Sequence, residues 1–284
     1  MPDQVNDWAP LPERPLIKIR VSKRWAPIEL REIWAHRELL YLLVWRDLKV
    51  RYKQTVLGAT WVILQPLLMT LVFAVFLGKI ARVSSGGVPY VLFLYSGLVP
   101  WTFFSNAVSS SSHSLIASAH MITKVYFPRS IVPAAAVLVR LSDFIIASFI
   151  LIILMLYYRQ PLHWAFLLAP LLILTLTLLA SALGMWFSAL NVKYRDIGTA
   201  LPVVLQLWMF ASPIVYPSSL VPQHWKWVYD LNPLTGIIEG FRASLLGQDL
   251  NMSSLVASGV ITLALLVNSM YAFRRLEDEL ADIV

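Results

Sequence analysis

Two pairs of charged residues fall inside or beside long apolar stretches, and they are the first candidates for chemistry in this sequence. Arg140 and Asp143 form one pair, and Glu239 and Arg242 form the other. Residues three apart meet on one face of a helix, so the members of each pair can neutralise each other. A charge in an apolar helix is costly and points by default to function. This spacing nevertheless favours two structural ion pairs over a substrate or proton relay.

A serine run, Ser109–Ser112, directly precedes His113 and raises the question of a serine nucleophile. An intramembrane serine protease needs its nucleophile and histidine brought together from different helices, and neighbours on one helix do not face each other. The run therefore favours a packing face of small residues. Cysteine is absent and the five histidines lack metal-ligand spacing, so we expect neither catalytic nor metal-binding residues.

A phosphate-binding loop for ATP requires GxxxxGK followed by serine or threonine. The Gly78-Lys79 pair is followed by Ile80, and Phe73 stands where the first glycine would be. We therefore expect no nucleotide or other cofactor in this chain, and any ATP to be hydrolysed elsewhere.

The composition places the chain in a membrane. Hydrophobic residues make up 58% of its 284 residues and charged residues only 14%, whereas soluble domains carry about 25% charged residues. A membrane-spanning helix needs roughly 20 apolar residues. The sequence predicts an all-α integral membrane protein with six transmembrane helices, one between Lys53 and Lys79 and the others over 89–112, 133–158, 164–190, 197–216 and 249–274.

Lysine and arginine gather on one side of these spans. With the N-terminus inside, 17 of the 23 basic residues fall in cytoplasmic segments, whereas the outer loops hold Lys79, Arg82, Arg159 and Lys226. Basic residues mark the cytoplasmic side, so we expect both termini in the cytoplasm. The net charge of +7 then reflects topology and attraction to anionic lipids, and we expect no nucleic acid partner.

The chain before the first span divides into a proline-rich cytoplasmic tail over 1–27 and an amphipathic interface helix over 28–53. Trp34 and Trp45 belong to its apolar face, and Arg37 and Arg46 belong to the charged residues opposite. Such a helix would lie on the inner membrane surface with its tryptophans at headgroup depth. Packing on a soluble partner is the alternative, and both can hold together.

The remaining chain forms a six-span domain over 54–274 and a cytoplasmic C-terminus over 275–284. Within it, the outer segment 212–247 carries four prolines interleaved with tyrosine and tryptophan. These prolines forbid one continuous helix. We expect two re-entrant half-helices before the last span, shielded by protein. Their aromatic residues fit an interfacial belt, and stacking faces for sugar rings are the alternative.

Four strings in this chain resemble the membrane subunit of type-2 ABC exporters for polysaccharides, the O-antigen, capsule and teichoic-acid permeases, and the likeness is closest to the O-antigen branch. They occur in the family's order and between the corresponding spans, and they cover the chain from about 28 to 274. The strings are RDLKVRYK over 46–53, followed by Leu57-Gly58 and Trp61; KVYFPR over 124–129; NVKYRD over 191–196; and SPIVYP over 212–217 with LNPL over 231–234.

This resemblance implies a homodimer in the bacterial inner membrane, with two copies of a cytoplasmic ABC ATPase that supply the ATP and Mg²⁺ chemistry. The substrate would be a glycan on an undecaprenyl-linked lipid anchor. The resemblance assigns ATPase coupling to Lys124, Tyr126, Phe127, Arg129, Tyr194, Arg195 and Asp196. It assigns contact with the ATPase and lipid headgroups to Trp34, Arg37, Trp45 and Arg46. Candidate channel-lining aromatics are Trp61, Phe73, Phe76, Trp101, Phe104, Trp208 and Phe210.

Two other readings remain open at this point. A drug or small-molecule ABC exporter would share the architecture, because fold does not specify substrate. A membrane enzyme that processes polyprenyl lipids belongs to another class, and we would expect it to carry Asp-rich cytoplasmic motifs for Mg²⁺. The cytoplasmic strings offer only the isolated Asp47 and Asp196.

Overall fold

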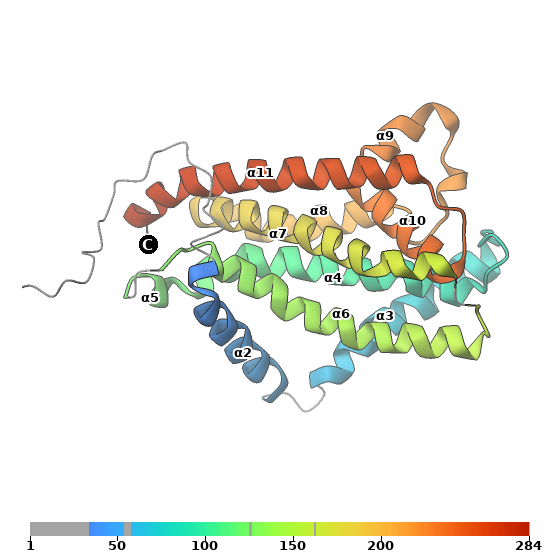
Figure 1. The fold of residues 1–284 in the computed structure, drawn as a ribbon, viewed down its shortest axis with the longest axis horizontal. Coiled ribbons are helices and arrows are strands. Elements are labelled where there is room, and N and C mark those ends of the chain that lie inside the picture. Colours follow the sequence, from blue (N-terminus) through green and yellow to red (C-terminus); the bar gives the residue numbers. More distant parts are fainter. Residues whose placement is uncertain (1–33, 54–57, 125–126, 162, 284) are drawn as a thin grey trace, which may run out of the picture.

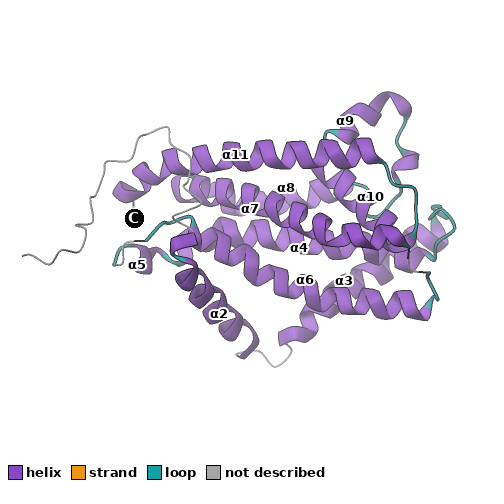
Figure 2. Ribbon diagram, viewed as in Figure 1, coloured by secondary structure: helices purple, strands orange, loops and turns teal. Residues whose placement is uncertain are grey.

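The computed structural model describes residues 34–53, 58–124, 127–161 and 163–283, and every regular element in these ranges is a helix (Figure 2). The predicted all-α fold is confirmed for this part of the chain. Several long helices run side by side along the longest axis of the molecule (Figure 1). The predicted tail over 1–27 and the beginning of the interface helix lie outside the described residues.

The helices follow one another without a strand between them in the described residues. In chain order they are α2 (Arg37–Lys53), α3 (Gly58–Phe73), the π-helix η1 (Ala74–Ile80), α4 (Tyr90–Ala117), α5 (Ala119–Ile122), α6 (Ile131–Tyr157), the 3-10 helix η2 (Trp164–Leu168), α7 (Ala169–Lys193), α8 (Asp196–Phe210), the 3-10 helices η3 (Ser218–Leu220) and η4 (Gln223–Trp225), α9 (Lys226–Asp230), α10 (Pro233–Leu246) and α11 (Met252–Ile283).

Five of the six predicted spans are long and apolar enough to cross a membrane. They cover Thr60–Ile80, Tyr90–Ala117, Ile131–Tyr157, Trp164–Lys193 and Met252–Leu276. The predicted span over 197–216 corresponds to α8, which has 15 residues. A helix of that length rises about 22 Å, less than the hydrocarbon thickness of about 30 Å. The chain leaves the helix after Phe210 and forms a turn over 211–214 that contains Pro213; proline disfavours a helix interior because it removes a backbone donor.

Helix α4 forms the centre of the bundle and packs against α3, α6, α7, α8 and α10. It has the lowest hydropathy of the five long segments, yet its core window is the most deeply buried. Ser111 and Ser112 lie fully inside, and the Ser111 hydroxyl donates to the carbonyl oxygen of Pro133 at 3.1 Å. The predicted packing face of small residues is confirmed, because these serines meet protein rather than lipid.

A proline inside the first predicted span does not interrupt its helix. Helix α3 continues through Pro66 to Phe73. The hydroxyl of Thr70 donates to the Pro66 carbonyl oxygen at 2.7 Å. Side chains of this kind help to satisfy backbone groups that a proline disturbs in membrane helices.

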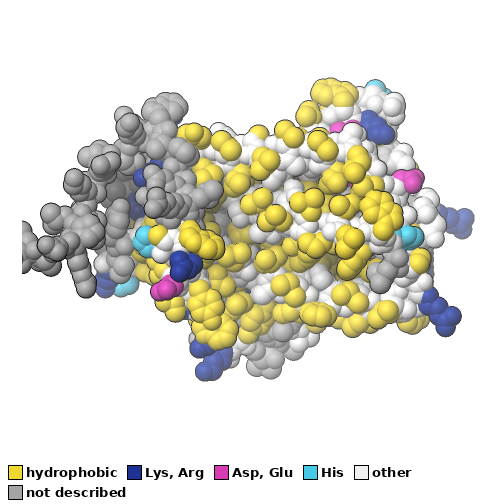
Figure 3. Space-filling model, in the orientation of Figure 1, with side chains coloured by type: hydrophobic (Ala, Val, Ile, Leu, Met, Phe, Trp, Pro, Cys, Tyr) yellow, Lys and Arg dark blue, Asp and Glu magenta, His cyan; other side chains and the backbone are white. Residues whose placement is uncertain are grey.

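The surface of the bundle is apolar along its length. Figure 3 shows hydrophobic side chains spread over the middle of one face, with lysine and arginine at the two ends. We call these ends the α2 end, where α2, α5 and the C-terminal end of α11 lie, and the α9 end (Figure 1). Such an apolar band between two charged ends is typical of a protein surrounded by lipid. Lipid chains are as apolar as these side chains, so burying the side chains in the protein brings no hydrophobic gain.

Two glycines in neighbouring helices give a matched test of this packing. A Cβ added to Gly236 on α10 would collide with the carbonyl group of Ser254 on α11, whereas one added to Gly259 on α11 would meet nothing within 4 Å. We expect Gly236→Ala to lower the free energy of unfolding by about 1–3 kcal/mol through overpacking. Gly259→Ala should leave it unchanged or raise it slightly, because alanine is the better helix former. Thermal unfolding in detergent measures both, and equal losses would contradict the packing described.

Candidate functional site

Asp143 on α6 is the centre of a polar cluster near the α2 end. Its Oδ2 atom lies 2.8 Å from Nη2 of Arg51 and 3.4 Å from Nη1 of Arg140. The hydroxyl of Tyr52 donates to Oδ1 at 2.6 Å, and Nε of Arg140 donates to the Ser110 hydroxyl at 2.7 Å. Burial and the hydrogen bond to Asp143 raise the pKa of the Tyr52 phenol, so it remains a donor at neutral pH. The cluster joins α2, α4 and α6.

The predicted pair Arg140–Asp143 is confirmed, but it is only part of this cluster. Arg51 and Tyr52 lie 91 or more positions from Asp143 in the sequence, so no periodicity brings them to notice. Both belong to the string 46–53, and the only signal was that this string carries part of the family resemblance. In the fold, Asp143 therefore does more than pair with Arg140 within α6. It also attaches α2, the first described helix, to the bundle.

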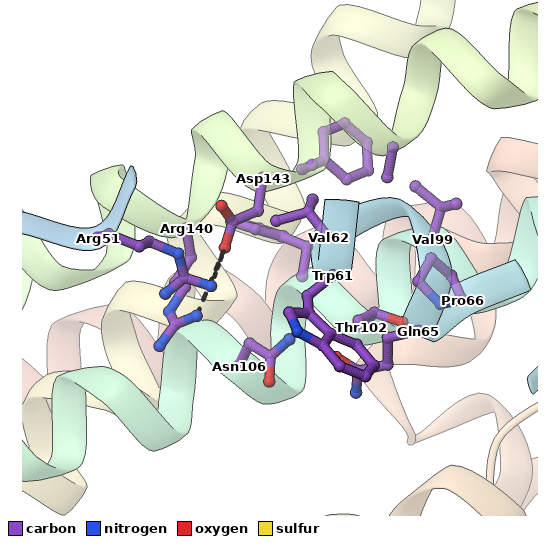
Figure 4. Close-up of a pocket in the computed structure, with 13 residues that line it drawn as sticks. Arg51, Trp61, Val62, Gln65, Pro66, Val99, Thr102, Asn106, Arg140 and Asp143 are labelled. Carbon is purple, nitrogen blue, oxygen red and sulfur yellow. Dashed lines mark hydrogen bonds and ion pairs between the residues drawn. The ribbon is translucent and has the colours of Figure 1, made fainter. Parts of the chain in front are cut away.

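Two cavities adjoin the cluster, and Arg51 and Arg140 line both of them. The smaller, of about 60 Å³, extends between α3 and α4 and is lined by Trp61, Gln65 and Asn106 among others (Figure 4). The larger, of about 340 Å³, lies between α2, α4 and α6. Arg51 and Arg140 therefore lie between two cavities and not in a close-packed core.

Arg242 on α10 forms a second polar centre, towards the α9 end. Only 2% of its surface is exposed. Its guanidinium donates to the carbonyl oxygens of Pro213 at 2.5 Å and Ile214 at 2.6 Å, and it lies over the Phe93 ring at 3.6 Å from the centroid. Because Pro213 and Ile214 follow α8 and Phe93 belongs to α4, Arg242 fastens three parts of the chain together.

The predicted ion pair between Glu239 and Arg242 is wrong, since no such pair occurs among the described residues. Backbone carbonyls of the turn after α8 take the place of the carboxylate. Side chains also bind neighbouring carbonyls of that turn. The Tyr90 hydroxyl donates to the Val215 carbonyl oxygen at 3.0 Å, and the Asn232 amide donates to the Ala211 carbonyl oxygen at 3.2 Å. A turn in an apolar environment leaves carbonyls without helical partners, and these donors satisfy them.

Beyond this turn, the outer segment contains two of the features expected of it. Helices α9 and α10 replace one continuous helix, and α10 is almost wholly buried by the bundle. A cavity of about 690 Å³ opens beside them, with Trp208, Tyr216, Trp225 and Tyr229 in its wall. Its aromatic faces suit both of the roles considered from sequence, a belt and a stacking surface.

The residues predicted to couple to an ATPase gather at the α2 end. Phe127 is buried in a hydrophobic cluster with Met185, Ala189 and Phe273, so it anchors the loop before α6. Tyr194, between α7 and α8, is 55% exposed. Tyr126 lies outside the described residues. The others flank these positions, with Lys124, Arg195 and Asp196 exposed and Arg129 half-buried.

Helix α2 occupies most of the range predicted for the interface helix, with Trp34 one turn before it; its position at a membrane interface stays a prediction. Leu43 packs into the hydrophobic cluster at the α2 end, whereas Trp34 and Trp45 are exposed. Arg37 stacks over the Trp34 ring, and Arg46 pairs with its neighbour Asp47. Leu43 packs on the bundle and Arg46 lines a cavity on that side. The predicted placing of tryptophans and arginines on opposite faces is wrong for Trp34 and Arg37, because the guanidinium of Arg37 lies over the Trp34 ring.

The candidate channel-lining aromatics separate into three groups by burial. Trp101 and Phe104 are buried in the main core, where Phe104 meets the edge of Trp208 at 5.5 Å between ring centroids. Phe73 and Trp208 are half-buried against the same core. The exposed candidates are Trp61, Phe76 and Phe210.

This helical architecture, with five helices long and apolar enough to cross a membrane in the described residues, defines a polytopic membrane protein, and comparison with known proteins gives its class. Residues 38–246 match the family described as ABC-2 type transporter. The chain therefore belongs to the ABC-2 type transporter family.

Similar proteins include export permeases from several bacteria. Two O-antigen export system permease proteins RfbA of Klebsiella pneumoniae are 29% and 30% identical, each over 87% of this chain and 95% of the relative. RfbA of Myxococcus xanthus is 29% identical over 89% of this chain and 98% of its own. The polysialic acid transport protein KpsM of Escherichia coli is 24% identical over 74% of this chain and 80% of its own.

Arg242 and Glu239 give a direct test of the corrected pairing. Arg242→Met removes the guanidinium donors from the Pro213 and Ile214 carbonyls, and we expect it to lower the free energy of unfolding by about 3 kcal/mol. Glu239→Gln should change it by no more than about 0.5 kcal/mol. Thermal unfolding of the detergent-purified variants measures both. If Glu239→Gln lowered the free energy of unfolding as much as Arg242→Met, the corrected pairing would be contradicted and the predicted ion pair supported.

Proposed function

We propose that this chain is the permease subunit of an ATP-driven exporter that moves lipid-linked polysaccharide of the O-antigen type across the bacterial inner membrane. The observation that carries the proposal is the likeness to RfbA of two bacteria along 95–98% of those proteins. The weaker likeness to a polysialic acid transport protein also concerns an exported polysaccharide. ATP hydrolysis is the task of a separate subunit.

In this proposal the α2 end faces the cytoplasm, in keeping with the basic residues there. The two termini are cytoplasmic. Helix α8 and the turn that Arg242 fastens together make the sixth crossing, because α8 alone is short of the bilayer thickness. Helices α9 and α10 then dip into the outer leaflet and return, protected by the bundle that buries α10.

Two copies of the chain and two copies of a cytoplasmic ABC ATPase complete the transporter. Tyr194, Arg195 and Asp196 form an exposed contact for the ATPase, and Lys124 and Arg129 flank a second one. Buried Phe127 holds that second loop against the bundle, so movement of the loop reaches α6 through packing. In this proposal α2 lies at the lipid headgroups beside the ATPase, and the exposed tryptophan and arginine side chains at this helix support that position.

The glycan passes along a surface between the two copies that includes exposed aromatics. Trp61, Phe76 and Phe210 offer flat apolar faces to sugar rings. Trp101 and Phe104 are buried within the chain. They therefore pack behind the residues that line the glycan path and do not contact the glycan themselves.

Export is tested in a bacterium whose own O-antigen permease gene has been deleted. Expression of this chain with its ATPase and the matching glycan biosynthesis genes should restore polysaccharide at the cell surface. The same cells with an ATPase that binds but does not hydrolyse ATP should accumulate the glycan inside. Export of a small-molecule dye without surface polysaccharide would instead favour the drug exporter.

ATPase docking is tested by co-purification. We expect Tyr194→Ala combined with Arg195→Ala to weaken ATPase binding about tenfold, since an exposed aromatic and arginine are the residue types that dominate interfaces. Trp227→Ala, which removes an equally exposed aromatic at the α9 end, is the control and should leave binding unchanged. Equal retention of the ATPase by all three proteins would refute the contact.

A further inference from the structure

Glu239 is a charged residue that the packing of the bundle leaves without a structural role. Every other residue of α10 is buried, whereas Glu239 is half-buried. Arg242, its expected partner, binds backbone carbonyls instead. Within the described residues the Glu239 carboxylate forms no hydrogen bond or ion pair. A partly buried carboxylate without a partner costs free energy unless water or a ligand binds it, so Glu239 is a candidate ligand-binding residue.

Glu239 lines a polar cavity at the α9 end. The cavity measures about 320 Å³, room for roughly ten waters. Four parts of the chain build its wall: the loop before α4, the segment from η3 to α9, helix α10, and the loop between α10 and α11. Beside four serines, the polar side chains in this wall include Lys226, Asp230, Gln248, Asp249 and Asn251. The cavity is therefore unlike the neighbouring aromatic cavity of about 690 Å³.

Hydrogen bonds within the protein fix part of this wall. The Asp230 carboxylate accepts from the Ser254 hydroxyl at 2.9 Å, and the side-chain oxygen of Asn251 accepts from the Ser254 backbone amide at 3.3 Å. The Gln248 amide donates to the Ser85 carbonyl oxygen at 3.4 Å. These bonds join α9 to α11 and the loop after α10 to the loop before α4, so the cavity is bounded by connected elements.

Donors and acceptors remain available in the same cavity. Lys226 and Asp249, like Glu239, form no hydrogen bond or ion pair within the described residues. An ammonium group only donates and a carboxylate only accepts. A divalent cation takes oxygen ligands and would be repelled by Lys226, and a phosphate would be repelled by the carboxylates. Neutral hydroxyl groups both donate and accept, so they match this mixed wall.

Tyr229 adds an aromatic side chain to the polar groups. It lines this cavity and also the aromatic cavity beside it. An aromatic ring offers a flat apolar face, and a sugar ring combines an apolar C–H side with a rim of hydroxyl groups. Carboxylates, an ammonium group and an aromatic ring around one cavity are therefore suited to a saccharide.

We propose that this polar cavity is a saccharide-binding site, with Glu239 as its principal hydrogen-bond acceptor and Lys226 as a donor. Resting on the proposed function, the ligand is a sugar residue of the exported polysaccharide at the outer end of its path. Glu239 is fixed on the buried helix α10, whereas Lys226 begins α9, which projects from the bundle (Figure 1). The site binds the sugar through its hydroxyl groups and makes no use of the lipid anchor.

Binding of lipid-free polysaccharide to the purified permease–ATPase complex in lipid nanodiscs tests the site. The probe is the O-polysaccharide of the bacterium that encodes this chain, cleaved from its lipid. We expect saturable binding that added Ca²⁺ does not displace. Binding of Ca²⁺ alone, with no polysaccharide bound, would overturn the assignment to a saccharide.

Two glutamates give a matched comparison of a ligand role with a structural one. Glu239→Gln keeps the size of the side chain but removes its charge, and it should weaken polysaccharide binding about fivefold, because hydrogen bonds to charged groups are the stronger ones. Its thermal unfolding should match that of the unmodified chain. Glu38→Gln removes an exposed carboxylate from α2 at the opposite end and should not change binding. Unchanged binding by Glu239→Gln, or weaker binding together with a large loss of thermal stability, would overturn the site.

The result is separable from the proposed function. A complex that exports polysaccharide normally with Glu239→Gln, and binds the lipid-free polysaccharide as before, overturns the saccharide site and leaves the exporter. A complex that binds the polysaccharide with the expected dependence on Glu239 but exports none overturns the exporter and leaves the site. Size-exclusion profiles establish that each variant is folded and assembled before binding is measured.

Discussion

Hydrocarbon offers no hydrogen-bond partner, so each polar group along the length of this bundle must find one in the protein. This constraint explains why α4, the least apolar of the long helices, lies at the centre. Its Ser111 donates to the Pro133 carbonyl oxygen of α6 and lies against Gly184 of α7. It also explains how the chain can turn after α8: the carbonyls exposed there are bound by Arg242, Tyr90 and Asn232. Closing that turn allows α10 to return into the bundle.

The two buried arginine centres serve different purposes. Arg242 is buried and donates to the backbone carbonyls of Pro213 and Ile214. These carbonyl dipoles are fixed in the backbone, so Arg242 stabilises a single arrangement of the turn after α8. Arg140 lies beside open cavities and shares a carboxylate with Arg51, so it links α6 to α2. Burial and the kind of partner decide which role each arginine has.

The α2 end combines two means of attaching α2 to the bundle. Leu43 packs with Phe127 and Phe273 in an apolar cluster, and Arg51 and Tyr52 bind Asp143. Apolar packing does not depend on a ligand, whereas the ionic contact responds to any anion that reaches it. Helix α2 is therefore attached to the bundle by apolar packing near its middle and by ionic contacts near its C-terminal end. This arrangement suits a permease in which substrate and ATPase meet on the same side, as we propose.

The sequence by itself determined the membrane class, the all-helical fold and five of the spans, because long apolar stretches bounded by charges have one stable form in lipid. It also determined the Arg140–Asp143 pair, since spacing along one helix is local information. It failed for Glu239 and Arg242, where the same spacing did not lead to an ion pair. Only the tertiary structure decided that carbonyls of a distant turn reach Arg242, and that Arg51 and Tyr52 reach Asp143. Both outcomes depend on which helices are neighbours, and helix periodicity carries no information about that.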